Sequence, residues 1–540
     1  MAAAGAAALA AMLWRMALEP VDFGYIRYLG IADEMARSGD WVVTRIVDRV
    51  YLDKPPLFFW LMAAPIALLG EAPGWVAHLP DLLALALSLF CVQRLGAAIY
   101  GRGEPALVGM LVFATTWETF NQASGKRLDL VFAAFLTAAF TAFYLGAAGG
   151  KEGRPQPILL ALAWLAVALA TLTKGPLAIL LFVLVALTWA AWSGRLRIFA
   201  SRGSLVGIAI CVGLAALWPA LLIGRLGFEE TLRALHGTDL ATRKGGLLLY
   251  TQNLPVLQLP WSLFFPALAA WLWRRRPWAA SNGFRFLLVW FIVIFVSLHF
   301  SEARHQRYLQ PATPALSLLL LCLWYEPGGG LAPLKGAAER LARWASAGCL
   351  ALLALGGSLA GVGLLLLDRE PFFGHEIPPE RWIAGPVALA TGAFAAFTLR
   401  RLRRTGVALQ SPLPLAVLLL GVLTSISLLA AGELRAKDPT KLARAALLPV
   451  TEGRPAALLG LDEEQHQMSR LLTRRPLLLL SSLEAAAQWA RSQPEPGALV
   501  LTNDAGRRAL AREPGLRIRI LRDFELAQER VELLEIRSGT

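Results

Sequence analysis

The residues best suited to chemistry lie in a long polar segment near the start of the chain, residues 19–80. Within it, Asp53-Lys54-Pro55-Pro56 joins a charged pair to two prolines, which prevent helix formation and hold the backbone extended. An apolar run, residues 57–69, follows directly. It is shorter than the roughly 20 residues that cross a bilayer, and short runs of this kind are typical of interfacial segments. Lys54 is therefore expected at the membrane surface, where an ammonium group is well placed to bind a lipid phosphate.

A second group of charged residues stands at the ends of long apolar runs further along the chain. Asp129 follows Lys126 and Arg127 where a loop meets a predicted membrane span. A carboxylate this close to a bilayer is costly unless it is paired or functional. We expect Asp129 to be catalytic; the structural alternative is a salt bridge with Lys126 or Arg127. Arg307 fits either phosphate binding or a snorkelling anchor, and Lys174 is expected mainly to anchor the turn between two spans.

The elements that must position these residues are membrane helices. The chain has 540 residues, of which 56% are hydrophobic and only 17% charged, and its mean hydropathy is +0.54. A soluble protein of this length needs far more polar surface, so a large soluble fold is excluded. About thirteen apolar runs are predicted to be spans. They lie at residues 2–18, 81–99, 105–118, 130–147, 157–173, 176–193, 205–224, 255–273, 284–300, 308–324, 345–367, 383–399 and 413–431. The predicted fold class is an all-α polytopic membrane protein.

The net charge of +14 reports membrane topology and gives no support for a nucleic-acid partner. Most of the arginines lie in short loops between apolar runs, and basic loops stay in the cytoplasm. The loops predicted to be cytoplasmic follow residues 99, 147, 193, 273, 324 and 399. The N-terminus is then cytoplasmic, and loops 19–80, 119–129, 174–175, 225–254, 301–307 and 368–382 face outward together with everything after residue 431.

The chain changes character after Glu433, so we predict a membrane domain at residues 1–433 and an extracytoplasmic α/β domain at residues 434–540. Short apolar runs alternate there with helical stretches. Strands are expected at 456–461, 477–480, 499–502 and 518–521, and helices at 463–472, 483–491 and 505–512. The domain has no glycine-rich nucleotide motif. The four cysteines lie inside apolar runs and show neither zinc nor disulfide spacing.

Several motifs in the first half of the chain resemble one known family. They are Arg27-Tyr28, Ser38-Gly39-Asp40-Trp41, Tyr51-x-Asp53-Lys54-Pro55-Pro56, Arg127-Leu128-Asp129, Leu172-Thr173-Lys174-Gly175-Pro176, Pro260-Trp261-Ser262 and Arg307-Tyr308-Leu309-Gln310-Pro311. In this order they resemble the superfamily of aminoarabinose transferases and protein O-mannosyltransferases, which are GT-C membrane glycosyltransferases. The likeness is dense over residues 26–130, patchy to about 320 and nearly absent beyond.

The resemblance implies a GT-C fold in the bacterial inner membrane and a reaction outside the cytoplasm. Members take a sugar from a polyprenyl-phosphate carrier and attach it to a lipid, glycan or protein acceptor. The departing phosphate needs cations or a metal to stabilise its charge, and the attacking hydroxyl needs a general base. The family has an aspartate where this chain has Gly24. Either Asp22, two residues upstream, takes over as the base, or the base is lost.

The resemblance also implies roles for particular residues. Asp22 and Asp129 are expected to be catalytic. The phosphate of the donor is expected to contact basic and phenolic side chains: Arg27, Tyr28, Tyr51, Lys54, Arg243 and Tyr308. Relatives use the acid beside the lysine to help hold a divalent metal, which here makes Asp53 a metal ligand with His236 as its partner. Lys244, beside Arg243, is an equivalent phosphate contact.

Two functions outside this reaction stay open at the level of sequence. A transporter or flippase of lipid-linked substrates would be expected to show internal repeats and charges near the membrane midplane, and neither is clear. A catalytically silent homologue that binds polyprenyl phosphate fits the substitution at Gly24.

Overall fold

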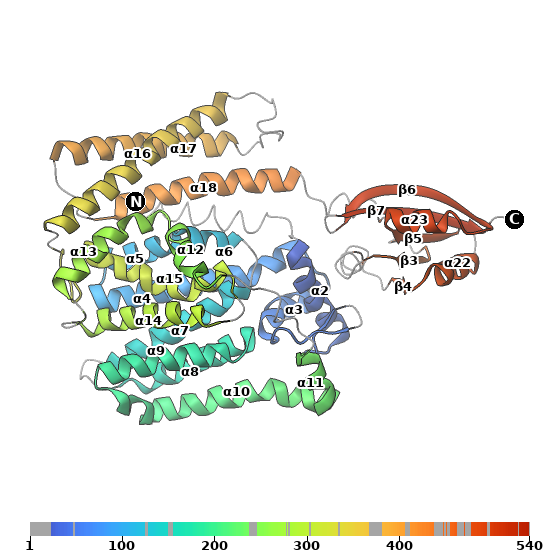
Figure 1. Ribbon diagram of the computed structural model, residues 1–540, viewed down its shortest axis with the longest axis horizontal. Coiled ribbons are helices and arrows are strands. Elements are labelled where there is room, and N and C mark those ends of the chain that lie inside the picture. The colour runs from blue at the N-terminus through green and yellow to red at the C-terminus, as the bar shows by residue number, and fades with distance from the viewer. Residues whose placement is uncertain are drawn as a thin grey trace. The chain divides into compact units, whose positions relative to one another are not determined.

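The computed structural model describes most of the chain and divides it into two compact units (Figure 1). The first comprises Met1–Leu18, Asp53–Phe58 and His78–Glu433, and the second comprises Glu19–Leu52, Phe59–Ala77 and Leu434–Thr540. The described residues are 23–46, 49–124, 128–148, 155–236, 246–276, 278, 281–301, 304–332, 335–366, 381–405, 411–436, 447, 450, 454–461, 469, 477–493, 497–526 and 529–538.

The first unit is a bundle of membrane-length helices. Seven described helices are long and apolar enough to span a bilayer. They contain α4 (Leu79–Tyr100), α7 (Leu128–Ala148), α8 (Pro157–Lys174), α10 (Arg202–Leu226), α14 (Asn282–His299), α16 (Ala337–Leu366) and α17 (Arg381–Thr405). The first unit also has the shorter apolar helices α5 (Glu104–Ala114), α9 (Leu177–Trp192) and α18 (Leu413–Ala436), whereas α3 (Leu57–Leu69) falls mostly in the second unit. The prediction of a multi-pass membrane protein is confirmed, whereas the number thirteen stays a prediction.

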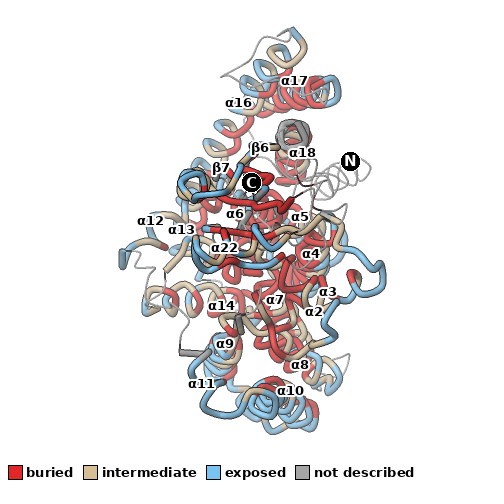
Figure 2. The backbone as a smooth tube through the Cα atoms, turned by 90° about the vertical axis from the view of Figure 1, so that its right-hand side faces the viewer, coloured by how far each residue is buried: buried red, intermediate tan, exposed pale blue. Residues whose placement is uncertain are grey.

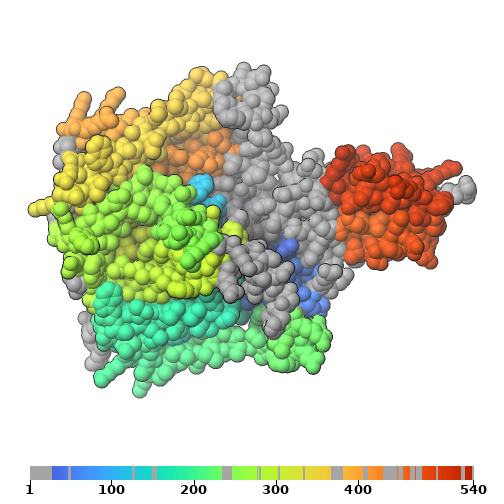
Figure 3. Space-filling view, viewed as in Figure 1, coloured from blue at the N-terminus to red at the C-terminus, as the bar shows by residue number. Residues whose placement is uncertain are grey.

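Helix α7 lies at the centre of this bundle. In an 18-residue apolar stretch of α7, 78% of the residues are buried, against 22% in the corresponding stretch of α10. Figure 2 shows α7 largely in red and α10 with long pale-blue stretches, and Figure 3 shows α10 on the outside of the unit. Aromatic rings pack around α7, with Phe140 4.6 Å from Trp290 between ring centroids.

Two predicted spans are wrong as continuous helices. The span at 255–273 is broken into α12 (Leu249–Leu257) and a second helix comprising η4 (Trp261–Phe264) and α13 (Phe265–Arg275), bent by 102°. The span at 308–324 is a series of short pieces: η6 (Gln306–Ala312), α15 (Thr313–Leu320) and η7 (Leu321–Leu323). Proline explains both breaks, because Pro260 and Pro311 lack the N–H that a continuous helix uses. Hydropathy alone does not distinguish a straight helix from a broken one.

Loops with the same predicted location contact one another. A guanidinium nitrogen of Arg195 donates to the carbonyl oxygen of Ala147 at 2.6 Å. The Tyr325 hydroxyl is 3.0 Å from a carboxylate oxygen of Glu104 and 3.1 Å from the hydroxyl oxygen of Ser411. All these residues belong to loops, or helix ends, that the arginine distribution assigns to the cytoplasm. Which side of the membrane they face stays a prediction.

The second unit contains the folded part of the first loop. Helix α2 (Phe23–Ser38) buries Ile31 and Met35. Asp33 is also buried and pairs with Arg37 one turn later. A short hairpin follows, β1 (Arg45–Ile46) and β2 (Arg49–Val50). The 13-residue run predicted to be interfacial forms α3, and the indole N–H of Trp60 donates to the carbonyl of Trp41 at 2.8 Å.

The C-terminal part of this unit contains a five-stranded sheet in the order β4-β3-β5-β7-β6. Strands β3 (Ala456–Leu459), β4 (Leu478–Leu480) and β5 (Ala498–Thr502) are parallel, and β6 (Leu516–Leu526) and β7 (Glu529–Ser538) complete the sheet in antiparallel fashion. Helices α22 (Leu483–Arg491) and α23 (Asp504–Leu510) match two predicted helices, and the third, at 463–472, lies almost entirely outside the described residues. Strand β7 was not predicted, because its mixture of glutamates and leucines resembles a helix.

A buried carboxylate in β7 stabilises this sheet. Arg454 donates to Glu535 at 2.7 Å, and Arg537 lies 3.2 Å from the other oxygen. Burial raises the pKa of Glu535, but the hydrogen bond from Arg454 and the charge of Arg537 outweigh it and hold that pKa below its ordinary value. The resulting stability is complete above the unfolded value of about 4.3 and is lost as the pH falls through the lower folded value.

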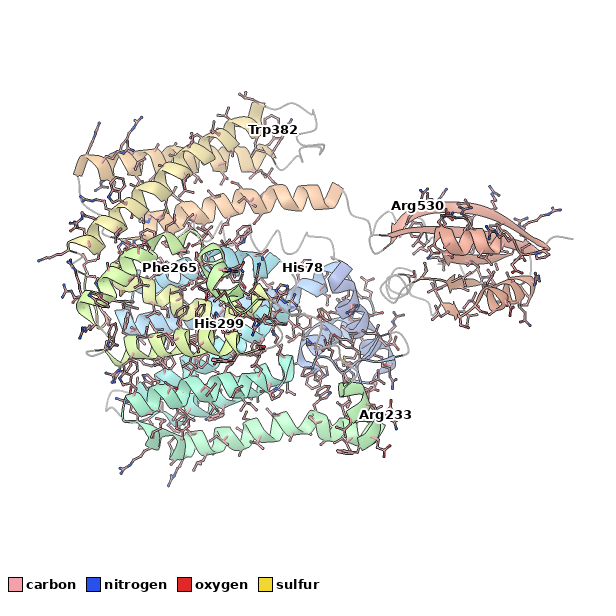
Figure 4. All side chains as sticks on the ribbon, in the orientation of Figure 1. His78, Arg233, Phe265, His299, Trp382 and Arg530 are labelled. Carbon is pink, nitrogen blue, oxygen red and sulfur yellow. The ribbon has the colours of Figure 1, made fainter. Side chains whose placement is uncertain are left out.

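We expect Arg454→Ala to destabilise the sheet by about 1–3 kcal/mol, because it removes a charged hydrogen bond from a buried acid. Hydrogen exchange of residues 529–538 in the full-length protein measures this. Arg530→Ala is the control, since Arg530 of β7, labelled in Figure 4, is 71% exposed and pairs with Asp523 of the edge strand β6. Equal protection of β7 in the two variants would contradict the role given to Glu535.

Candidate active site

Three charged side chains from distant parts of the sequence meet in the first unit. The Asp129 carboxylate, in the first turn of α7, accepts a hydrogen bond at Oδ1 from the amino group of Lys174. Its Oδ2 lies 2.8 Å from Nε of Arg307. The Asp129 side chain is only 4% exposed, against 14% for Lys174 and 21% for Arg307. We call these three residues the ion cluster; two cations share one buried carboxylate, so the cluster carries a surplus positive charge.

The aromatic ring of Tyr308 completes the cluster. The amino nitrogen of Lys174 lies 3.8 Å from the centre of that ring, and the guanidinium carbon of Arg307 lies 5.8 Å away. Cations are attracted to the electron-rich face of an aromatic ring. Tyr308 therefore fixes Lys174 from one side while Asp129 fixes it from another.

The ends of α8 and η6 position the two cations. Lys174 is the last residue of α8, which ends at Gly175 with φ +93°, a conformation that suits glycine. Arg307 lies in η6, a 3₁₀ helix, in which side chains three residues apart share one face. That face carries Arg307, Gln310 and then Thr313 at the start of α15.

Three glutamines, one of which belongs to this face, form the hydrogen bonds between the face and neighbouring helices. Gln122 of α6 (Trp117–Ser124) donates to the carbonyl oxygen of Arg307 at 3.4 Å and to Glu118 at 2.9 Å. Gln310 donates to the Thr119 hydroxyl at 3.4 Å. Gln258, at the end of α12, donates to the Thr313 hydroxyl at 3.0 Å. All three glutamines are buried; the bonds of Gln122 and Gln310 connect η6 to α6, and the bond of Gln258 connects the end of α12 to the start of α15.

Two histidines lie beside the ion cluster. His305 precedes η6 and caps it, with its ring 6.0 Å from that of Tyr308. His299 ends α14 and is labelled in Figure 4; its ring is 5.4 Å from that of Tyr250. Tyr250 also accepts a bond from the backbone N–H of His305 at 3.4 Å.

The other predicted residues of the first loop form separate contacts. The amino group of Lys54 is 2.6 Å from the carboxylate of its neighbour Asp53. Both belong to the first unit, as does the ion cluster. Tyr28 and Tyr51 belong to the second unit and pack on Phe59, with centroid distances of 5.8 and 6.3 Å. Arg27 precedes Tyr28 in the same helix.

Some predictions fall outside the described residues. These are Asp22, Arg243 and Lys244, and the side chain of His236. The predicted metal site depends on His236, and its other ligand, Asp53, is paired with Lys54. Within the ranges given above, no group of three His, Cys, Asp or Glu side chains is placed to hold a metal ion. The metal site stays a prediction.

The structure revises the partners that we expected for Asp129. Both Lys126 and Arg127 lie outside the described residues, and the described partners are Lys174 and Arg307. Lys174 was expected mainly as a turn anchor and His305 was not considered. The signal for Lys174 was available, because loops 119–129, 174–175 and 301–307 were all predicted to face the same side.

Comparisons with known proteins agree with the motifs. Residues 53–222 match the dolichyl-phosphate-mannose-protein mannosyltransferase family. The chain is 27% identical over 397 residues to the undecaprenyl phosphate-α-4-amino-4-deoxy-L-arabinose arabinosyl transferase of Edwardsiella ictaluri, covering 69% of this chain and 66% of that protein. For the enzyme of the same name from Pseudomonas paraeruginosa the identity is 28% over 407 residues, covering 74% and 70%.

A solved structure shares the fold. The crystal structure of ArnT from Cupriavidus metallidurans bound to undecaprenyl phosphate superposes with a TM-score of 0.72 at 20% identity, covering 98% of this chain and 96% of that one. Together with the sequence matches, this confirms the family resemblance drawn from the motifs.

We expect Lys174→Met to lower the thermal midpoint of the detergent-purified protein, because the buried Asp129 then loses one of its two ion-pair partners among the described residues. Breaking a buried ion pair on one side costs about 3–5 kcal/mol. Arg233→Met is the matched control, since Arg233 is 72% exposed and pairs with exposed glutamates of its own helix. A Lys174→Met midpoint equal to that of the control would show that the ion pair contributes nothing to stability.

Gln122→Glu should loosen η6 although the shape is unchanged, because a carboxylate cannot donate to Arg307 and repels Glu118. Gln122→Lys restores a donor and should recover more of the thermal midpoint. If Glu and Lys behave alike at this position, donation by Gln122 is not what holds η6.

Proposed function

We propose that this chain, a membrane-embedded relative of the aminoarabinose transferases, moves a sugar from a polyprenyl-phosphate carrier to an acceptor on the extracytoplasmic side of the membrane. The observation that carries the proposal is the ion cluster, which assembles three of the motifs on which the family resemblance depends. Its cations outnumber its carboxylate, and a partly exposed surplus of positive charge beside a membrane suits a lipid phosphate.

The chemistry explains why such a cluster is useful. In the transfer, the bond between the sugar carbon and the phosphate oxygen breaks, and the carrier phosphate leaves with an additional negative charge. Cations held in place before the reaction stabilise that charge without reorganising. An acceptor hydroxyl forms the new bond to the sugar carbon and gives its proton to a base.

The proposed roles follow from the contacts of each side chain. Lys174, Arg307 and Tyr308 contact the departing phosphate. Asp129 orients the two cations, because both of its oxygens already bind them. This replaces the catalytic role that the resemblance implies for Asp129, and leaves Asp22 as the proposed base.

The remaining residues keep the roles that the family resemblance assigns to them. Lys54, with Arg27, Tyr28, Tyr51 and Arg243, is proposed for the donor phosphate. Asp53 and His236 keep their proposed role as metal ligands, but no third His, Cys, Asp or Glu ligand joins them among the described residues, and no step of the proposed reaction uses a metal. We propose an inner-membrane location; a lipid, a glycan and a protein acceptor are equally compatible with the residues of this chain.

Lys54→Ala should reduce sugar transfer about ten- to a hundredfold, since a charged contact to phosphate contributes roughly 1.5–3 kcal/mol. The assay is transfer from an undecaprenyl-phosphate-linked sugar by purified, detergent-solubilised protein. Lys335→Ala removes an exposed lysine and is the control. Full activity of well-folded Lys54→Ala would eliminate the phosphate role of Lys54.

The proposed side of the reaction depends on the predicted topology. A reporter that is active only in the cytoplasm should give no signal when fused after Thr540. The same reporter inserted in the arginine-bearing loop after residue 193 should be active. A strong signal at the C-terminus would reverse the assignment of sides.

A further inference from the structure

One face of the C-terminal sheet carries a group of arginines near the end of β7. Strands β6 and β7 are antiparallel, with Arg517 opposite Arg537 and Arg519 opposite Glu535. Directly opposite residues of neighbouring strands lie on the same face of a sheet. Arg454 joins them there, because it donates to Glu535 at 2.7 Å. We call these four arginines and Glu535 the basic patch.

The basic patch lies on the face of the sheet that α22 and α23 do not cover. The residues that alternate with it along β6 and β7 pack in the core beneath these two helices: Leu516, Ile518, Leu534 and Ile536. Successive residues of a strand point to opposite faces, so the patch residues of both strands point away from the helices. Arg517 and Arg519 are exposed, and the side chain of Arg537 is 46% exposed.

Positive charge is in excess in the basic patch, which has four guanidinium groups and one carboxylate. The two oxygens of Glu535 already contact Arg454 and Arg537. Arg517 lies directly opposite Arg537, and like charges in that position destabilise a sheet. An anion bound at the patch would offset this repulsion.

Part of the arrangement has a structural explanation. Strand β6 is at the edge of the sheet (Figure 1), and charged residues on an edge strand hinder pairing with other chains. This protection accounts for Arg517 and Arg519, but it does not require Arg517 to lie opposite Arg537. It is also independent of the lipids around the protein, so an experiment can separate the two explanations.

The surface of the surrounding bilayer is the anion most accessible to the patch. Residues 437–453, 17 in all, connect Arg454 to the end of the apolar helix α18 at Ala436. A chain of this length reaches at most about 60 Å, so lipid headgroups are present at a high effective concentration. A second copy of this chain is a poor partner, because a symmetric dimer would bring two identical basic surfaces together.

We propose that the basic patch binds the headgroups of anionic phospholipids and holds the C-terminal sheet at the membrane surface. The attraction is electrostatic, so salt weakens it. Each arginine near an anionic bilayer strengthens such binding about fivefold. The proposal does not depend on the sugar transfer proposed above.

The test uses the full-length protein in lipid nanodiscs, with a fluorescent donor attached after Thr540 and acceptor-labelled lipid in the bilayer. Energy transfer increases when the C-terminal sheet lies on the bilayer. The nanodiscs contain either phosphatidylcholine alone or phosphatidylcholine mixed with anionic phosphatidylglycerol.

Two double variants with the same change in net charge are compared. Arg517→Gln with Arg519→Gln removes two arginines of the basic patch. Arg508→Gln with Arg512→Gln is the matched control. It removes two exposed arginines from α23 and the turn that follows it, and α23 packs on the opposite face of the sheet.

We expect more energy transfer in anionic than in neutral nanodiscs at low salt, and no difference at high salt. In the Arg517→Gln, Arg519→Gln variant, the equilibrium for the bilayer-bound state should fall about thirtyfold, because two contributions of about fivefold are lost. The control should keep the difference between anionic and neutral nanodiscs.

Three results would overturn the proposal. The first is equal energy transfer by the wild-type protein in neutral and anionic nanodiscs at low salt. The second is a wild-type response in the variant that lacks Arg517 and Arg519, which would leave edge protection as their role. The third is an equal loss in both double variants, because the bilayer would then respond to the net charge of the domain and not to the patch.

Discussion

The carboxylate of Asp129 holds two cations that would otherwise repel each other at the end of a helix bundle. Lys174 ends α8, Arg307 belongs to η6 and Asp129 begins α7, so one side chain joins three segments that are far apart in sequence. The arrangement is stable only because the carboxylate is shielded from water, which makes each attraction stronger, and because both of its oxygens are used. The position of the proposed phosphate site depends on this interaction.

The polar interior around η6 also follows from the need to hold Arg307 beside Asp129. In a continuous helix through residues 308–324, the direction of that helix alone would determine the position of Arg307. The broken path instead exposes backbone and side-chain groups that need partners inside a membrane bundle, where an unsatisfied polar group is expensive. Gln122, Gln310 and Gln258 supply those partners, so the glutamines are best understood as the supports of a bent segment.

Much of this organisation could be predicted from the sequence, and the failures have physical reasons. The membrane helices follow from long apolar runs, and the candidate site follows from motifs at the ends of those runs. Asp129, Lys174 and Arg307 could have been joined in advance, since their loops were predicted to face one side. The 3₁₀ geometry of η6 and the glutamine contacts could not, because they depend on how proline-broken segments pack against α6. The departure at Gly24 is visible in sequence, whereas its compensation by Asp22 concerns residues outside the described part of the chain.

The most direct measurement of the central claim is an experimental structure of this protein with undecaprenyl phosphate bound. Our account predicts that the phosphate oxygens lie within hydrogen-bonding distance, about 3 Å, of Lys174 or Arg307 while Asp129 still contacts both cations. A phosphate bound elsewhere, with the ion cluster unchanged and out of its reach, would contradict the account.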